Sequence, residues 1–353
     1  MKKKMSKKKN LERVTLGTHL ARDVEVMTSP YTVTGPGITA APPLSLSTRP
    51  SIRILSLKKA KDEIGGEDAG QDQDSLEFVL TGSSLPIANL LRRLIISEVP
   101  TMAIDSVCVI ENEGVVFDEA LCHRLGLVPI HAPSHKFEYV SDMSVYNNAE
   151  HPDGRYFLRF TLEVEGKSDI PTPVYSHHLV WEPLPGQESL ASYDIGVVNK
   201  NILIAKLAKG QRIKLRALAM KGLGMVHAKW SPVSCATYRM APCVSINPKA
   251  KRRSAEANKE IALKCPMGVF DIEDCDTLKV VNEAACTGCR ECIREESDDS
   301  EGVVILQRKK DELIFSVESL GQMSAVHVVT TALEDYSAHC RLLKSEVQNA
   351  QLS

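Results

Sequence analysis

Four of the ten cysteines in this 353-residue chain have a spacing that could hold a metal. Cys286, Cys289 and Cys292 form the run C-x2-C-x2-C, and Cys265, followed by Pro266, lies upstream. Iron–sulfur sites of the ferredoxin type combine such a run with a distant Cys-Pro, so these four thiolates predict one [4Fe-4S] cluster. Zinc also takes four thiolates, although zinc sites usually pair two C-x2-C knuckles. A fold that holds no metal is the third alternative.

The other six cysteines show no such spacing. Cys275 falls between Cys265 and Cys286 and could compete as a ligand. The other five lie mostly in apolar segments and are expected to be small core residues: Cys108, Cys122, Cys235, Cys243 and Cys340. The sequence contains no Walker-type phosphate loop, no dinucleotide-binding turn, no G-x-S-x-G elbow and no H-E-x-x-H motif. We therefore expect no self-contained active site.

The composition narrows the class of protein. Lys and Arg (43) nearly balance Asp and Glu (45), and the net charge of −2 excludes a globally basic nucleic-acid coat. No run approaches the roughly 18 apolar residues of a membrane helix, and no apolar stretch follows the Lys-rich residues 1–10. Residues 1–50 are predicted to be a disordered basic arm and linker. This arm is either an import signal, a contact with nucleic acid, or a solubilising tail.

Two long amphipathic helices are predicted at residues 86–98 and 323–348. The first carries apolar residues on two sides, because Ile96 projects away from the main stripe and Arg92 and Arg93 flank it. The second carries an unbroken a/d seam over three heptads, which is longer than a small sheet can cover, so part of it is expected to pack against another chain. The main stripe of the first helix is Ile87, Leu90, Leu91, Leu94 and Ile95; the seam of the second is Val326, Val329, Leu333, Tyr336, Cys340, Leu343 and Val347.

The remaining periodic segments have the alternation of β-strands. Residues 51–57 and 75–81 flank an acidic, Gly-containing linker at 62–74, and residues 156–165 and 212–219 alternate apolar with polar side chains. Residues 302–306 and 313–318 are predicted to form a hairpin around the charged residues 308–312. Helices and strands are thus mixed along the chain, which indicates the α+β class.

Residues 89–104 (NLLRRLIISEVPTMAI) and 117–130 (FDEALCHRLGLVPI) resemble the signature of α-like RNA polymerase subunits. Residues 222–232, 265–270 and 315–319 match in the order of that family, so the resemblance covers about residues 50–345. Within the family the sequence is most similar to the larger α-like subunit type shared by nuclear RNA polymerases I and III, and to archaeal relatives. The polymerase II type carries a cysteine-rich zinc loop, whereas residues 131–154 contain no cysteine.

The resemblance implies an α+β architecture with a discontinuous dimerisation domain, formed by about residues 51–106 and 233–353. A β-rich domain at about 107–232 is inserted between these segments, and a ferredoxin-like insertion occupies about 250–300. It also implies a non-catalytic assembly subunit in the nucleus (nucleolus and nucleoplasm), which pairs with the small α-like subunit and then nucleates the two large catalytic subunits. DNA would be reached only through the complex. The implied partner contacts are Arg92, Arg93, Ile96, Val326, Val329, Leu333, Tyr336 and Leu343.

Two other functions are considered. The cysteine set alone would suit an iron–sulfur electron carrier or redox sensor, but such a protein needs only the insertion and not the rest of this chain. Metal binding would more simply fold the insertion, because metal-binding free energy is also folding free energy. Direct DNA binding through the Lys-rich arm is the third possibility.

Overall fold

The computed structural model describes residues 13–16, 21–22, 50–58, 74–140, 152–247, 254–273, 276–294 and 302–350. The Lys-rich residues 1–10, most of the acidic linker and Cys275 lie outside the described residues. Within the predicted disordered arm, two short strands are described, β1 (Arg13–Leu16) and β2 (Ala21–Arg22). Two compact units alternate along the sequence: residues 1–54, 78–89 and 238–315 form one, and residues 55–77, 90–237 and 316–353 form the other.

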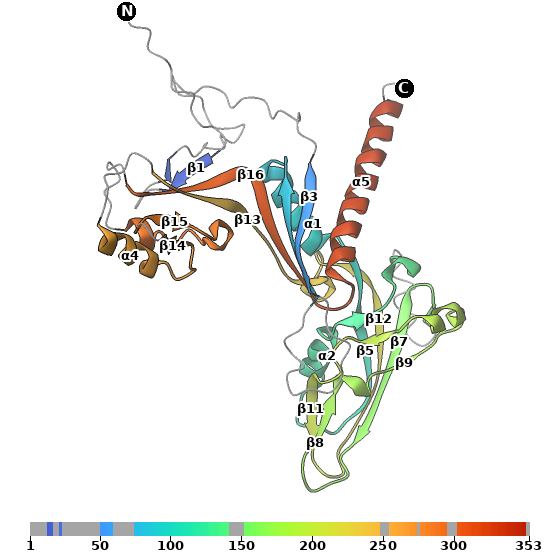
Figure 1. Cartoon of the computed structure of the whole chain (residues 1–353). Coiled ribbons are helices and arrows are strands. Elements are labelled where there is room, and N and C mark those ends of the chain that lie inside the picture. The colour runs from blue at the N-terminus through green and yellow to red at the C-terminus, as the bar shows by residue number, and fades with distance from the viewer. Residues whose placement is uncertain are drawn as a thin grey trace, which may run out of the picture. The chain divides into compact units, whose positions relative to one another are not determined.

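The largest sheet joins strands from distant parts of the sequence. Its order is β2-β1-β16-β4-β3, and β13 also pairs with β16 (Figure 1). The predicted strands at 51–57 and 75–81 correspond to β3 (Ser51–Lys58) and β4 (Ser75–Thr81). The two long strands are β13 (Val233–Ile246) and β16 (Val304–Ser319). A strand order so different from the sequence order is set by long-range pairing, which the alternation within one strand does not reveal.

The hairpin predicted at 302–318 is wrong, because β16 is one continuous strand through the charged residues. Lys309 Nζ and Glu312 Oε2 form an ion pair of 3.1 Å there. The Gly82 N–H donates to the carbonyl oxygen of Asp311 at 3.1 Å. Residues 308–312 contain no Gly, Pro or Asn, and Asp311 is the only residue of a type that turns favour. The charged run therefore stays extended and pairs with its neighbours.

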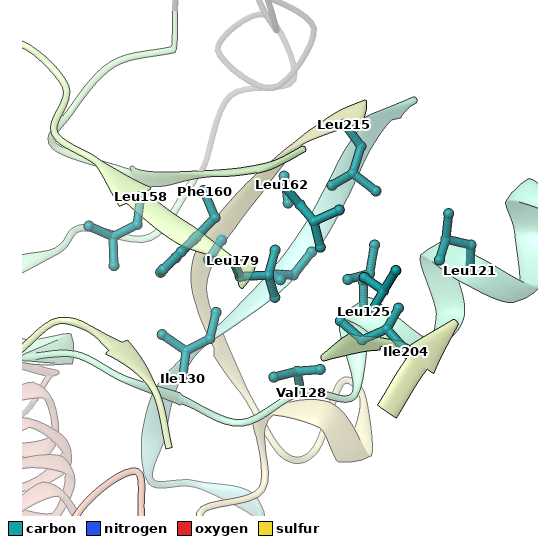
Figure 2. Packing of buried hydrophobic residues seen from close by; sticks show 14 of the residues in the cluster. Leu121, Leu125, Val128, Ile130, Leu158, Phe160, Leu162, Leu179, Ile204 and Leu215 are labelled. Atoms are coloured by element: carbon teal, nitrogen blue, oxygen red, sulfur yellow. The ribbon is translucent and has the colours of Figure 1, made fainter. Parts of the chain in front are cut away.

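A second, antiparallel sheet has the order β5-β12-β7-β9 (Figure 1). The predicted alternation at 156–165 is confirmed at Leu158, Phe160 and Leu162, which are buried, but Phe157 on the opposite face is also buried. The first three residues pack with Leu121 and Leu125 of helix α2 in one apolar core (Figure 2). The bounds are β5 (Pro100–Asn112), α2 (Asp118–Gly126), β7 (Phe157–Glu165), β9 (Val180–Glu182) and β12 (Arg212–Leu223). The smaller strands are β6 (Ile130–His131), β8 (Thr172–Tyr175), β10 (Gly196–Val197) and β11 (Leu203–Leu207).

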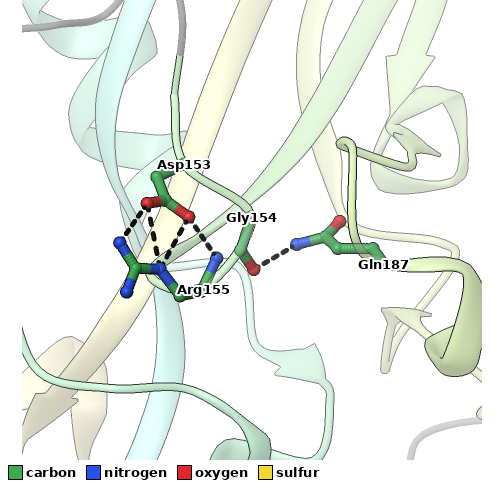
Figure 3. A network of polar contacts seen from close by, with 4 residues as sticks. All are labelled: Asp153, Gly154, Arg155 and Gln187. Atoms are coloured by element: carbon green, nitrogen blue, oxygen red, sulfur yellow. Dashed lines mark hydrogen bonds and ion pairs between the residues drawn. The ribbon is translucent and has the colours of Figure 1, made fainter.

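The entry into β7 is held by a buried glutamine. Gln187 Nε2 donates to the carbonyl oxygens of Gly154 (2.8 Å) and Phe157 (2.7 Å), and its Oε1 accepts from the Leu184 N–H at 3.0 Å. An ion pair of 2.8 Å between Asp153 and Arg155 spans the same turn (Figure 3). With both ends of its amide paired, the buried polar side chain carries no unsatisfied group.

The cysteine-bearing segment has a small core of its own. Helix α4 (Ala255–Lys264) precedes the antiparallel pair β14 (Phe270–Ile272) and β15 (Leu278–Val280). Their core includes Ile261, Phe270 and Ile293, and Cys265, Cys286 and Cys292 pack against it. The other buried residues of this core are Val244, Val269, Val303, Val304 and Leu306. Among the helices that the structure describes, none has both the length and the apolar composition required to cross a bilayer.

Candidate functional site

Helix α5 (Ala325–Ala350) corresponds to the predicted C-terminal helix, with both ends shifted slightly toward the C-terminus. Its start is fixed by an acidic residue, because Asp74 Oδ2 accepts a hydrogen bond of 3.1 Å from the Ala325 N–H. A carboxylate at a helix N-terminus satisfies an orphan donor and complements the helix dipole. The bond ties the start of α5 to the residue that precedes β4.

Only the first turns of α5 are buried within the chain. Ala325, Val328, Val329 and Ala332 are buried at i, i+3, i+4 and i+7, which is one side of a helix. Residues 338–350 are exposed throughout. The chain's own core therefore uses a short part of this 26-residue helix.

The predicted seam lies largely outside that buried side. Val329 is the exception, since it is 7% exposed and belongs to the chain's own core rather than to a free contact surface. The other apolar seam residues form a stripe along nearly the full helix: Val326 (39% exposed), Leu333 (41%), Tyr336 (40%), Leu343 (66%) and Val347 (60%). A stripe of this length is typical of a helix that packs against a second chain.

Helix α1 (Leu85–Ser97) also presents two apolar sides. The predicted single stripe divides, because Leu91 and Ile95 are buried whereas Leu90 and Leu94 are half-buried and Ile87 is exposed. Ala88 completes the buried side. Of the predicted contact residues on this helix, Arg93 is exposed, and Arg92 and Ile96 are half-buried.

The loop after β12 covers the C-terminal end of α1. The Met225 N–H donates to the carbonyl oxygen of Ser97 at 3.0 Å. At Gly224, a Cβ would lie 2.3 Å from the carbonyl oxygen of Ile96, so this close approach requires glycine. Met225 and Val226 are 65% and 71% exposed and thus add an apolar tip to the loop at this end of α1.

The four predicted ligand cysteines come together in one pocket. Cys265, Cys286, Cys289 and Cys292 line it with Met267, Val269, Phe270, Thr287, Arg290 and Leu306. The loop is tightly curled, since Gly288 and Arg290 have φ values of +76° and +68°, and a positive φ is uncommon for arginine. In the part of the chain that the structure describes, no three His, Cys, Asp or Glu side chains are already arranged to hold a metal ion.

The thiols of this pocket interact electrostatically. Burial, and then the neighbouring Cys286, Cys289 and Cys265, raise the pKa of Cys292 to about 12. A group that binds the Cys292 sulfur must therefore displace a proton from it. The prediction that the remaining cysteines are core residues is wrong for Cys108 and Cys340, which are exposed, and it is correct for Cys243; Cys122 and Cys235 are half-buried.

Residues 77–340 match the family "RNA polymerase Rpb3/Rpb11 dimerisation domain". The chain belongs to this family. It is accordingly an Rpb3-like RNA polymerase subunit. Helix α1 lies within the matched region, and the matched region includes most of helix α5.

The relatives of this Rpb3-like chain carry several names. It is 33% identical to "DNA-directed RNA polymerases I and III subunit rpac1" of Dictyostelium discoideum, over 83% of this chain and 84% of the relative. It is 36% identical to the human "DNA-directed RNA polymerases I and III subunit RPAC1", over 80% of this chain and 84% of the relative. "DNA-directed RNA polymerase subunit Rpo3" of Methanosphaera stadtmanae is 32% identical, over 79% of this chain and 94% of the relative.

Several apolar residues of the Rpb3-like chain are exposed although the sequence does not predict their exposure. On β3, Ile52, Ile54 and Leu57 are exposed, although that strand was predicted. At the tip before α2, Val115 and Phe117 are 82% and 80% exposed. For Val115 and Phe117, the sequence offers only one sign of exposure, an apolar residue beside a glycine or an acidic residue in a turn. That pattern is too common to identify an exposed residue. Which apolar residues face solvent is decided by tertiary packing.

Proposed function

We propose that this chain is the larger α-like subunit of nuclear RNA polymerases I and III, and that it acts in assembly rather than in catalysis. It would form a heterodimer with the small α-like subunit, and the pair would then bind the two large catalytic subunits. Transcription of ribosomal, 5S and transfer RNA would be the process served, in the nucleolus and nucleoplasm.

The observation that carries this proposal is the exposed apolar stripe on α5 in a chain of the dimerisation-domain family. Interfaces of obligate complexes bury roughly 2,000 Å² or more and are rich in apolar area. Leu333, Tyr336 and Leu343 would be the anchors on α5. Arg93, with Arg92 and Ile96 beside it, would face the second-largest subunit.

The choice of polymerases I and III rests on two supports. The rpac1 and RPAC1 relatives are named as subunits of polymerases I and III. The "DNA-directed RNA polymerase II subunit rpb3" of Dictyostelium discoideum is also 32% identical to this chain. Sequence identity alone therefore does not distinguish the polymerase I and III type of subunit from the polymerase II type. The absence of cysteine from residues 131–154 favours the I and III type over the polymerase II type.

Affinity purification of the tagged chain from cell extract, followed by mass spectrometry, tests the proposal. We expect the small α-like subunit and the largest subunits of both polymerases I and III, without the largest subunit of polymerase II. Recovery of the polymerase II subunit, or of no polymerase subunit, would refute the assignment.

We propose further that Cys265, Cys286, Cys289 and Cys292 hold one [4Fe-4S] cluster. The donor set fits in kind, since four thiolates suit iron–sulfur clusters. All four cysteines line one pocket, although in the described residues no three of them are already arranged to hold a metal ion. When bound, the cluster would cross-link α4 and the curled cysteine loop and so stabilise this segment. The family match spans residues 77–340, far more than this segment, which favours an assembly subunit over an independent electron carrier.

Anaerobic purification of the full chain in its complex is expected to give a brown protein with iron and acid-labile sulfide in equal amounts. Cys286→Ser should remove the iron–sulfur absorption, because an alcohol replaces one of four thiolate ligands. Cys108→Ser is the matched control, since Cys108 is exposed on β5 outside the pocket. Bound zinc in place of iron, or normal folding with no metal, would contradict the cluster.

A further inference from the structure

A second hollow lies beside the cysteine pocket and is lined by two arginines. Arg239 of β13 and Arg308 of β16 line it together with Thr287 and Gly288. Cys286, Thr287 and Leu306 line both hollows, so the two share one wall. The other residues of its lining are Met240, Pro242 and Gln307.

The charges in this hollow are unbalanced. Arg308 is half-buried and Arg239 is exposed, and neither guanidinium has an ion pair or hydrogen bond with any residue that the structure describes. Their strands are paired in the sheet, which keeps both cations at the same hollow. Two like charges held together repel each other, and a bound anion would remove that repulsion.

Neutral donors lie at the same place. Within the described part of the chain, the Thr287 hydroxyl and the Gly288 N–H have no hydrogen-bond partner. Both residues belong to the curled loop, where Gly288 has a φ of +76°. Two guanidiniums, one hydroxyl and one backbone N–H can together serve an anion that has several acceptor oxygens.

We infer that this hollow is a binding site for a single phosphate group. A carboxylate has two oxygens, whereas a phosphate offers more acceptors and up to two negative charges, which suits four donors better. A nucleic-acid backbone is a poorer fit, because such binding sums many phosphate contacts and this hollow offers two arginines in a chain of net charge −2. The group is either free phosphate or a phosphorylated side chain of a partner.

The site would also act on the cysteine loop. Thr287 and Gly288 stand between Cys286 and Cys289, so a phosphate bound to them would hold the same loop that carries two of the pocket's thiols. In the metal-free chain, phosphate binding is therefore expected to protect Cys286 and Cys289 from alkylation, which provides a second readout.

Isothermal titration of the full chain in its soluble complex, with inorganic phosphate and with O-phosphoserine, tests the inference. We expect saturable binding that Arg239→Ala or Arg308→Ala weakens at least about tenfold, since a charge-assisted hydrogen bond is lost. Arg239→Lys and Arg308→Lys keep the charge but lose the planar fork, so they should give intermediate affinities and also serve if an alanine variant misfolds. Arg216→Ala, an exposed arginine on β12, is the control and should leave binding unchanged.

The ratio of the affinities for O-phosphoserine and for inorganic phosphate identifies the source of the bound phosphate group. Tighter binding of O-phosphoserine supports a phosphorylated side chain, and tighter binding of inorganic phosphate supports the free ion. Binding that is absent, or that persists unchanged in all four variants at Arg239 and Arg308, overturns the site. Preference for a single-stranded oligonucleotide over both small ligands, with a steep dependence on salt, overturns it in favour of a nucleic-acid contact.

Discussion

Replacing Tyr336 and Leu343 with aspartate should prevent the chain from forming its heterodimer with the small α-like subunit. Both side chains are exposed in the isolated chain, at 40% and 66%, so the change does not disturb the chain's own core. In the complex, each carboxylate would be buried without a partner, at a cost of at least about 3 kcal/mol. Each substitution alone should therefore weaken the pair more than about a hundredfold. Co-purification and sedimentation velocity of the co-expressed chains measure the effect.

Ala338→Asp provides the matched control for this prediction. Ala338 is exposed on the same helix, two positions beyond Tyr336 and so about 200° around the helix axis. The same charge placed there should leave the heterodimer intact. If the double variant pairs as well as the wild-type chain, the α5 stripe is not the dimer contact, and the assembly proposal loses its main structural support.

Phe315→Ala should lower the free energy of unfolding by about 3–5 kcal/mol, the largest stability loss that we expect from a single change. Phe315 is completely buried in β16. Its ring stacks on Phe78 at a centroid distance of 4.9 Å and on Tyr238 at 5.4 Å. Removing it deletes contacts with strands β4 and β13 at once and leaves a cavity between them. Thermal unfolding of the complex should show a clearly lower transition temperature.

Phe117→Ala is the control for Phe315→Ala, because it makes the same truncation at an exposed position and so tests whether burial causes the loss of stability. Phe117 is 80% exposed, so the same truncation should change stability by no more than about 0.5 kcal/mol. Equal losses at both positions would mean that β16 does not carry the core of its sheet. If Phe117→Ala destabilised the complex and Phe315→Ala did not, Phe117 would lie in an interface at the tip before α2.

The cysteine pocket and the α5 stripe were largely predictable because both are local patterns. The spacing of Cys286, Cys289 and Cys292 follows from the short loop that bears them, and the a/d repeat needs only one helix. The prediction failed where a neighbouring element decides the outcome. Val329 lies on the seam but turns into the chain's own core, and Cys108 lies in an apolar segment but faces solvent.

The sequence by itself determined the period of each helix and strand, the cysteine set and the family motifs, since these depend on residues close together in the chain. Tertiary structure alone decided that residues 308–312 extend through a strand, and that Arg239 and Arg308 line one hollow with Thr287. The physical reason is strand pairing. Alternation within a strand specifies which residues share a face, but only the partner strand determines what lies beside them.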